Sequence, residues 1–291
     1  MLPAITTKKK RSFSIVVLAL FLAGIMPLLL GGTQAGRRLW HATLLRSNFQ
    51  EWEALDTEYF YLRYPAKEAD FVQWWAREAD EAARKVNEIF QYRAKKKPWL
   101  VIVPDQATMQ KVFGWSDSTH ALGVYQADTI LLLSPQAWNW LPQGRQISVF
   151  AAENPLIHEY THFVLDNEAK AFYPRWFSEG LAQLLAYRLQ GYVWVDEESL
   201  VGTEVFPPPE LERSFDKVET QEVAYGQALS MVTFLAELQG MEGLHTVIKL
   251  LAQGRNFYKA LAQVYALEEN EFFLLWRQWW QENPHWLSRG V

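Results

Sequence analysis

The chain contains no cysteine. This absence excludes a disulfide framework, a thiolate metal site and a cysteine nucleophile, and it leaves the redox compartment undecided. The chain also lacks an excess of positive charge, because 28 Lys and Arg face 33 Asp and Glu and give a net charge of −5. Without a basic stripe that could follow a phosphate backbone, we expect no nucleic-acid partner.

No internal repeat is apparent in the sequence, and its composition is that of a folded protein. The 291 residues are 49% hydrophobic and 15% aromatic. A chain of this size and hydrophobicity can bury a substantial core. We therefore expect one large domain or two closely packed lobes, and no long disordered region.

The N-terminal 36 residues have the pattern of a membrane-targeting segment. Residues 8–11 are Lys-Lys-Lys-Arg and precede the uncharged, mainly apolar stretch 12–32. Such a stretch is long enough to cross a bilayer as a helix, and the preceding charges favour a cytoplasmic N-terminus. A cleaved signal peptide is the alternative, since Pro27 could break the helix and residues 33–35 could form a cleavage site. We favour a retained anchor that places the rest of the chain outside the cytoplasm, because the stretch exceeds the usual signal-peptide core.

Residues 158–162, His-Glu-Tyr-Thr-His, carry the clearest functional signal. On a helix, His158 and His162 stand about 40° apart around the axis and roughly 6 Å apart along it, so both imidazoles can reach one zinc ion. Glu159 lies between them, where a carboxylate can act as a general base without being a ligand. Catalytic zinc needs a third protein ligand and an open position. Glu179 is the candidate for the third ligand.

The segment 158–182 resembles the gluzincin metallopeptidases, in particular the bacterial peptidase MA-like proteins. The His-Glu-x-x-His motif is followed at 176–182 by Trp-Phe-Ser-Glu-Gly-Leu-Ala, which is similar to the Trp-x-x-Glu-Gly-x-Ala pattern of that family. The resemblance runs from about residue 59 to about residue 280, and its specific part is 158–182. It implies a thermolysin-like catalytic lobe in which Glu179, on a second helix, is the third zinc ligand.

The expected chemistry is hydrolysis of a peptide bond. Two neutral imidazoles and one carboxylate leave zinc with one positive charge and lower the pKa of its water towards about 7. Glu159 would take up a proton from that water and pass it to the leaving amine. Tyr225 is the candidate donor to the oxyanion, because in gluzincins an aromatic donor follows the glutamate ligand by several tens of residues. A core tyrosine with a satisfied hydroxyl is the competing interpretation.

Two further residues are candidates to orient the ligands. Asp166 lies one turn beyond His162, and Gln183 lies one turn beyond Glu179. Outer residues, which hydrogen-bond to the ligands without touching the metal, fix the tautomer and orientation of ligand histidines. Thermolysin-like gluzincins carry an acid where Gln183 stands, so this departure predicts a weaker acceptor and weaker catalysis.

Residues 121–125 and 129–133 flank a turn and predict an antiparallel hairpin directly before the metal helix. The hairpin resembles the gluzincin strand that holds an extended substrate. This resemblance implies that Gly123, Val124 and Tyr125 bind substrate by backbone hydrogen bonds. An ordinary sheet edge is the alternative.

The patterns predict an α+β fold, with a small mixed sheet packed on the active-site helix and a mainly helical C-terminal half. Residues 37–57 are expected to connect the N-terminal segment to a catalytic domain, residues 58–291, and 39–55 within this connection are expected to be helical. The metal helix is expected at 146–166, where Pro155 either begins it behind an Asn154 cap or kinks a longer helix. A short strand is expected at 192–195.

The sequence thus favours a membrane-anchored zinc metallopeptidase that acts on a peptide or protein substrate. The alternative is a catalytically weak or inactive module at the cell surface, in which zinc stabilises a peptide-binding cleft. Glu159 favours the enzyme, because a binding module has no need of a general base.

Overall fold

The computed structural model describes residues 34–287 apart from positions 94, 118, 143, 170–171, 196–199, 201 and 219. The predicted charged and apolar segment, residues 8–32, lies outside the described residues. Among the helices that the described residues form, none is long and apolar enough to cross a membrane.

One half of the molecule is built on a five-stranded mixed sheet in the order β1-β2-β3-β5-β4. The strands are β1 (Glu53–Asp56), β2 (Tyr61–Tyr64), β3 (Trp99–Val103), β4 (Gly123–Gln126) and β5 (Thr129–Leu133). The inner strands β2, β3 and β5 are parallel, and β1 and β4 are antiparallel edges. All five residues of β5 are buried, as expected for a central strand that is covered on both faces. The predicted hairpin is confirmed as β4 and β5.

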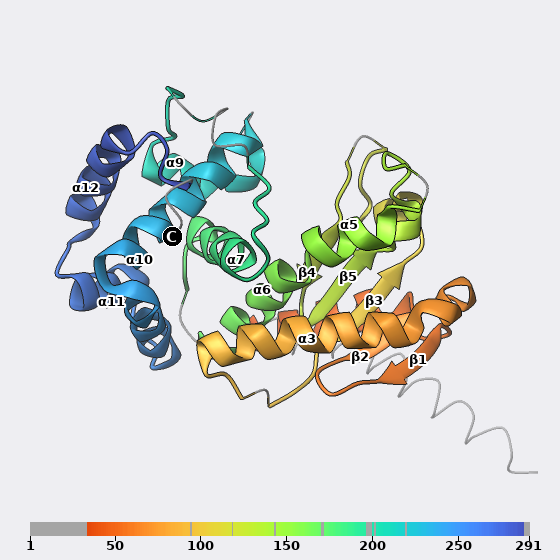
Figure 1. Ribbon diagram of the computed structural model, residues 1–291. Coiled ribbons are helices and arrows are strands. Elements are labelled where there is room, and N and C mark those ends of the chain that lie inside the picture. The colour runs from red at the N-terminus through yellow and green to blue at the C-terminus, as the bar shows by residue number, and fades with distance from the viewer. Residues whose placement is uncertain are drawn as a thin grey trace, which may run out of the picture.

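Helices pack on this sheet and share its core. The helix α3 (Val72–Phe90) follows the 3-10 helix at Ala66–Phe71, and its buried stripe includes Trp75, Ala79 and Val86. The helix α6 (Leu156–Glu168) contacts α3, β4 and β5. In Figure 1 the long α3 runs across the sheet, and α6 lies between the sheet and the helical half. The short α4 (Gln106–Phe113) joins β3 to the hairpin.

The C-terminal half is helical, as predicted, and the structure gives it a core of its own. It contains α7 (Arg175–Gln190), α9 (Pro208–Ser214), the 3-10 turn Phe215–Lys217, α10 (Gln221–Ala252), α11 (Phe257–Tyr265) and α12 (Glu269–Glu282). A second 3-10 turn, Pro135–Ala137, follows β5 in the sheet half. The helix α10 bends where Gln239 and Gly240 leave helical geometry. The helices α7 and α10 lie against each other beside α6 (Figure 1). They can do so because a Cβ on Gly180 would lie 2.1 Å from the carbonyl oxygen of Ala228.

The metal helix is shorter than predicted. Residues 146–168 form two helices, α5 (Gln146–Glu153) and α6, because Asn154 is extended and Pro155 begins a new turn. The side chain of Asn154 accepts a hydrogen bond from the N–H of Leu156 at 3.0 Å. This arrangement matches the first of the two alternatives, in which Asn154 caps a helix that starts at the proline.

Two other expectations are wrong. Residues 192–195 form no strand. The segment 37–57 is not a mere connector, because it supplies most of α2 (Gln34–Ser47) and the edge strand β1. Leu45 and Phe49 are buried in the core of the sheet half. The folded body therefore begins before Glu58.

Candidate metal centre

The two histidines of the motif converge on one point beside α7. Nε2 of His158 lies 3.1 Å from Nε2 of His162, and the ring centroids are 4.7 Å apart. Residues four apart lie on the same face of a helix, and here that face of α6 meets α7. The helix pair therefore determines where the ε nitrogens point.

The third side chain of this group comes from α7. Oε2 of Glu179 lies 3.2 Å from Nε2 of His158, and Oε1 lies 3.5 Å from Nε2 of His162. The ligand atoms of the three residues all lie within 4.8 Å of one another. Glu179 is 1% exposed. The structure thus brings together the three residues that the sequence predicted as ligands.

This triangle of donor atoms fits a zinc ion. Four tetrahedral ligands at about 2.0–2.1 Å from zinc are separated from one another by about 3.3 Å. The distance between the two histidine nitrogens is 3.1 Å, and each nitrogen has one of the two Glu179 oxygens at a similar distance, 3.2 Å to Oε2 for His158 and 3.5 Å to Oε1 for His162. Oε2 of Glu179 is buried and has no hydrogen-bond partner among the described residues, although buried carboxylate oxygens normally have one. Two imidazoles and one carboxylate are also a common donor set for catalytic zinc.

Ser178 orients one of the two histidines, and sequence reasoning missed it. Its hydroxyl lies 2.8 Å from Nδ1 of His162. If Nε2 binds a metal, Nδ1 carries the proton and the serine oxygen accepts it in a hydrogen bond. The position directly before Glu179 was the signal in the sequence, because α7 presents both residues to α6.

Replacing Ser178 with Ala is expected to weaken zinc binding by about 10- to 100-fold, the usual cost of losing an outer partner of a ligand. The fold should survive, since only one buried hydroxyl is removed. Competition with a chromophoric chelator measures the zinc affinity, and thermal unfolding of the metal-free protein serves as the control. Wild-type affinity in this variant would show that Ser178 does not orient His162.

Arg175 is the second residue that sequence reasoning missed. Its Nη1 lies 2.7 Å from Oε1 of Glu179, and its Nε donates to Asp216 at 3.4 Å. The arginine stands one turn before Glu179 on α7, so the i,i+4 spacing was the available signal. The guanidinium holds the carboxylate in its ionised form and in one orientation.

The protonation states of Glu179 and His162 suit a metal. Burial raises the pKa of Glu179, but the neighbouring side chains of His162, His158 and Arg175 outweigh burial and lower the pKa to about 2. Burial lowers the pKa of His162 to about 3. Burial also opposes protonation of His158, but the adjacent carboxylate of Glu179 outweighs burial and raises the pKa of His158. An ionised carboxylate and a neutral imidazole are the forms that bind zinc.

Glu159 lies next to this group under the edge strand. It is 7% exposed, and burial raises its pKa to about 7 against the opposing effect of His158. Its carboxylate accepts a hydrogen bond from the backbone of Tyr125. A Cβ on Gly123 would lie 2.9 Å from both Cγ and Oε1 of Glu159. Glycine at that position therefore allows the strand to pass close to the carboxylate.

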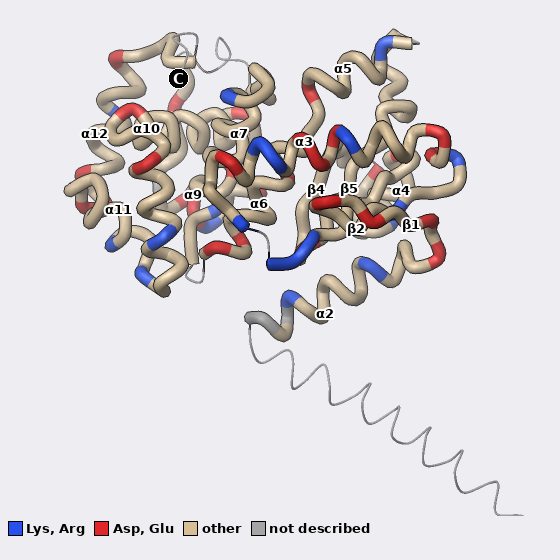
Figure 2. Tube along the Cα trace, turned by 60° about the horizontal axis from the view of Figure 1, so that its bottom comes forward, with Lys and Arg blue, Asp and Glu red and all other residues tan. Residues whose placement is uncertain are grey.

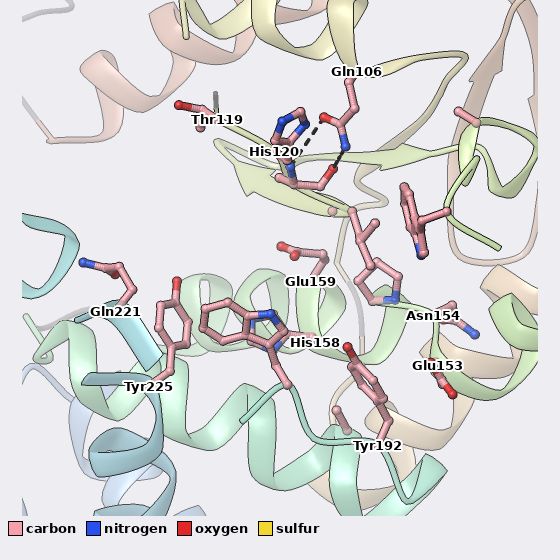
Figure 3. A pocket seen from close by; sticks show the side chains of 18 of the residues that line it. Gln106, Thr119, His120, Glu153, Asn154, His158, Glu159, Tyr192, Gln221 and Tyr225 are labelled. Atoms are coloured by element: carbon pink, nitrogen blue, oxygen red, sulfur yellow. Dashed lines mark hydrogen bonds between the residues drawn. The ribbon is translucent and has the colours of Figure 1, made fainter. Parts of the chain in front are cut away.

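A cleft of about 1350 Å³ opens over Glu159 and His158 between the sheet half and the helical half. Figure 3 shows Gln106, Thr119 and His120 on the sheet side, Tyr192 and Tyr225 on the opposite side, and Glu159 and His158 between them. The side-chain amide of Gln106 donates to the carbonyl oxygen of Ala121 and accepts from its N–H. This pair of bonds fixes the segment that leads into β4.

The predicted substrate strand contributes differently from what we expected. Of Gly123, Val124 and Tyr125, only Gly123 is among the described residues that line the cleft. The N–H of Tyr125 bonds Glu159, and its ring lies against His162 with centroids 6.3 Å apart. The segment 119–123, which leads into β4, borders the cleft instead.

The two predicted outer residues do not contact the histidines. Asp166 accepts hydrogen bonds from the hydroxyls of Tyr125, at 2.9 Å, and Tyr173. One turn of helix carries its side chain towards β4 and away from Nδ1 of His162. Gln183 donates to the carbonyl oxygens of Glu179 and Tyr225, so it ties α7 to α10. Its Oε1 is buried without a partner among the described residues.

Tyr225, the candidate oxyanion donor, lines the cleft in the first turns of α10. Its ring packs edge-on against Trp194 and Phe215. Burial raises its pKa above the usual value, so the hydroxyl keeps its proton at neutral pH. The structure thus places a hydroxyl donor in the same cleft as Glu159.

Comparison with known proteins leaves the family of this chain open. No family model matches it. It is 24% identical over 206 residues to the uncharacterized protein YhcO of Bacillus subtilis (strain 168), a match that covers 67% of this chain and 62% of YhcO. The chain therefore spans less than two thirds of the length of that curated relative.

Among solved structures, the fold is similar to leukotriene A4 hydrolase from Saccharomyces cerevisiae. The native enzyme matches with a TM-score of 0.48 and 12% identity, over 81% of this chain and 39% of that one. The yeast enzyme in complex with bestatin matches with a TM-score of 0.45 and 13% identity, over 82% and 38% of the two chains. Likenesses at this level do not assign an activity.

Proposed function

We propose that this protein is a zinc-dependent metallopeptidase that is anchored to a membrane by its N-terminal segment. The observation that carries the proposal is the buried triangle of His158, His162 and Glu179 donor atoms, with the carboxylate of Glu159 beside it in the same cleft. The triangle has the dimensions of a zinc site, and Glu159 stands where a general base is needed. The apolar stretch 12–32 supports the anchor and an extracytoplasmic cleft.

Zinc, when bound by these three residues, would act as a Lewis acid and lower the pKa of water at the open position. Glu159 has a pKa of about 7, so it can both take up and release a proton near neutral pH. It would accept a proton from the attacking water and return it to the leaving amine. The hydroxyl of Tyr225 would donate a hydrogen bond to the developing oxyanion.

The shape of the cleft supports an extended peptide as substrate. The backbone of residues 119–123 borders one side, where a peptide could add as a further strand. Trp140 and Trp194 line the cleft and are 55% and 54% exposed. Their faces offer apolar surface to the side chains of a bound peptide. Binding by backbone and apolar contacts predicts broad sequence tolerance.

The test is incubation of the full-length protein with a mixed peptide library, before and after removal of metal by a chelator. We expect about one zinc per chain, cleavage that stops on chelation, and recovery when zinc is restored. Bound zinc without cleavage would favour the alternative, a zinc-stabilised peptide-binding module. A protein that binds no zinc would overturn both.

A further inference from the structure

The helix α2 places an arginine into a polar cluster directly behind the zinc triangle. Nη2 of Arg38 donates to the hydroxyl of Tyr125 at 2.8 Å, and Nη1 donates to the carbonyl oxygen of Asp166 at 3.1 Å. The guanidinium also forms an ion pair with Asp128 and lies 3.5 Å from the carboxylate of Asp166. One side chain thus joins α2 to β4, to the β4–β5 turn and to α6.

The contact with Asp166 is well suited to an arginine. Asp166 lies in the last turn of α6, where carbonyl oxygens have no partner within the helix. A cation at this end is also favoured by the helix dipole. Arg38 therefore holds the C-terminal end of the helix that carries both histidines, from a position 128 residues away in the sequence.

Tyr125 connects this cluster to the site. Its hydroxyl donates to Asp166 at 2.9 Å, its ring lies nearly parallel to that of His162, and its N–H bonds the carboxylate of Glu159. A shift of Tyr125 would therefore disturb both His162, which its ring contacts, and Glu159, which its N–H bonds.

We infer that Arg38 is a positioning residue for the zinc site, acting through Tyr125 and Asp166, so that the site is complete only while α2 is docked. This inference rests on the proposed function. In Figure 2, α2 lies beside the strands and apart from the helical half. It is the first described element after the predicted membrane segment, so it links that segment to the site.

The same helix offers a matched control. Arg46 also reaches the β4–β5 turn from α2, where Nε donates to Thr129 Oγ1 at 3.0 Å and Nη2 to the carbonyl oxygen of Asp128 at 2.6 Å. Neither contact touches Tyr125 or Asp166. Ala42 and Leu45 of α2 are themselves buried, so apolar contacts also hold this helix in place. Loss of either arginine should therefore leave α2 docked.

The experiment compares Arg38→Gln, Arg46→Gln, Tyr125→Phe and the double variant of Arg38 and Tyr125, each in the full-length protein. We expect Arg38→Gln to lower kcat and zinc affinity by about 10- to 100-fold with little change in KM. Tyr125→Phe should lower kcat and zinc affinity to a similar extent. The double variant should lower them little further, because both changes break the same contact between Arg38 and Tyr125. Arg46→Gln should keep wild-type kcat and zinc affinity.

Equal effects of Arg38→Gln and Arg46→Gln, or additive effects in the double variant, would overturn the inference. Absence of zinc or of peptide cleavage in the wild-type protein would count against the proposed function, and it is therefore distinguished from an effect of the variants. A readout that needs neither zinc nor turnover is the NMR spectrum of labelled histidine in the metal-free protein. The ring signals of His162 should shift in Arg38→Gln and stay in place in Arg46→Gln, and unshifted signals in both variants would contradict the inference.

Discussion

Replacing Glu159 with Gln is expected to reduce kcat for peptide hydrolysis by about 100- to 10,000-fold while zinc stays bound. The range is what a positioned general base contributes. The amide matches the carboxylate in size, so it fits beneath Gly123 and can still accept the hydrogen bond from Tyr125. It cannot take up a proton. The three proposed ligands are unchanged, which is why the metal should remain.

The measurement is kcat on a peptide substrate together with the zinc content of the purified variant. Glu153→Gln is a suitable control, because Glu153 lines the same cleft but lies outside the triangle. It should keep both activity and zinc. Undiminished cleavage by the Glu159 variant would exclude the residue as the base, and loss of zinc would show that it acts as a ligand.

Stability gives an independent check on Glu159 in the metal-free protein. Its pKa of about 7 lies above the value of about 4.3 in an unfolded chain. The folded state then binds the proton more tightly, so the contribution of this residue to stability falls as the pH rises from about 4.3 to about 7. At pH 8 the Gln variant should therefore unfold at the same temperature as the wild type or at a higher one.

Replacing Glu179 with Ala is expected to weaken zinc binding by more than about 100-fold, because loss of a ligand should exceed the cost of losing an outer partner. The change removes both oxygens that face the histidines. It also leaves the guanidinium of Arg175 without its partner on α7, so some loss of thermal stability is expected as well.

Titration of the metal-free Glu179 variant with zinc, against a competing chelator, measures the effect. Glu179→Gln separates the two consequences, because it keeps the volume and an oxygen that can accept from Arg175. Both variants should bind zinc poorly, and the Gln variant should unfold at the higher temperature. Stoichiometric zinc of wild-type affinity in both would remove Glu179 from the metal site.

Local sequence patterns predicted the elements well where the periodicity was strong. The predicted residues 129–133 form the strand β5, in which all five residues are buried. The failures lie where the pattern was short or interrupted. Four apolar residues at 192–195 gave a false strand, because isolated apolar residues can also line a cleft, as Trp194 does. Residues 53–56 were missed as a strand, since pairing with β2 was needed to make β1.

The sequence by itself identified the three candidate metal ligands. A histidine pair at i,i+4 with a glutamate between them predicts a metal site, since helical geometry alone sets the spacing of the imidazoles. The glutamate at 179 followed from its own local pattern. Each of these inferences used residues within 25 positions of one another, where the backbone conformation dictates geometry.

The tertiary structure decided what surrounds that group. Ser178 and Arg175 became visible only when α7 was packed on α6, and Asp166 turned out to face β4 instead of a histidine. Arg38 contacts Tyr125 and Asp166 from α2, a helix in the segment that was predicted to be a connection. Contacts between distant segments depend on how whole helices and strands pack, and local periodicity does not encode that packing. The three candidate ligands were therefore predictable from the sequence, and the residues that hold them in place were not.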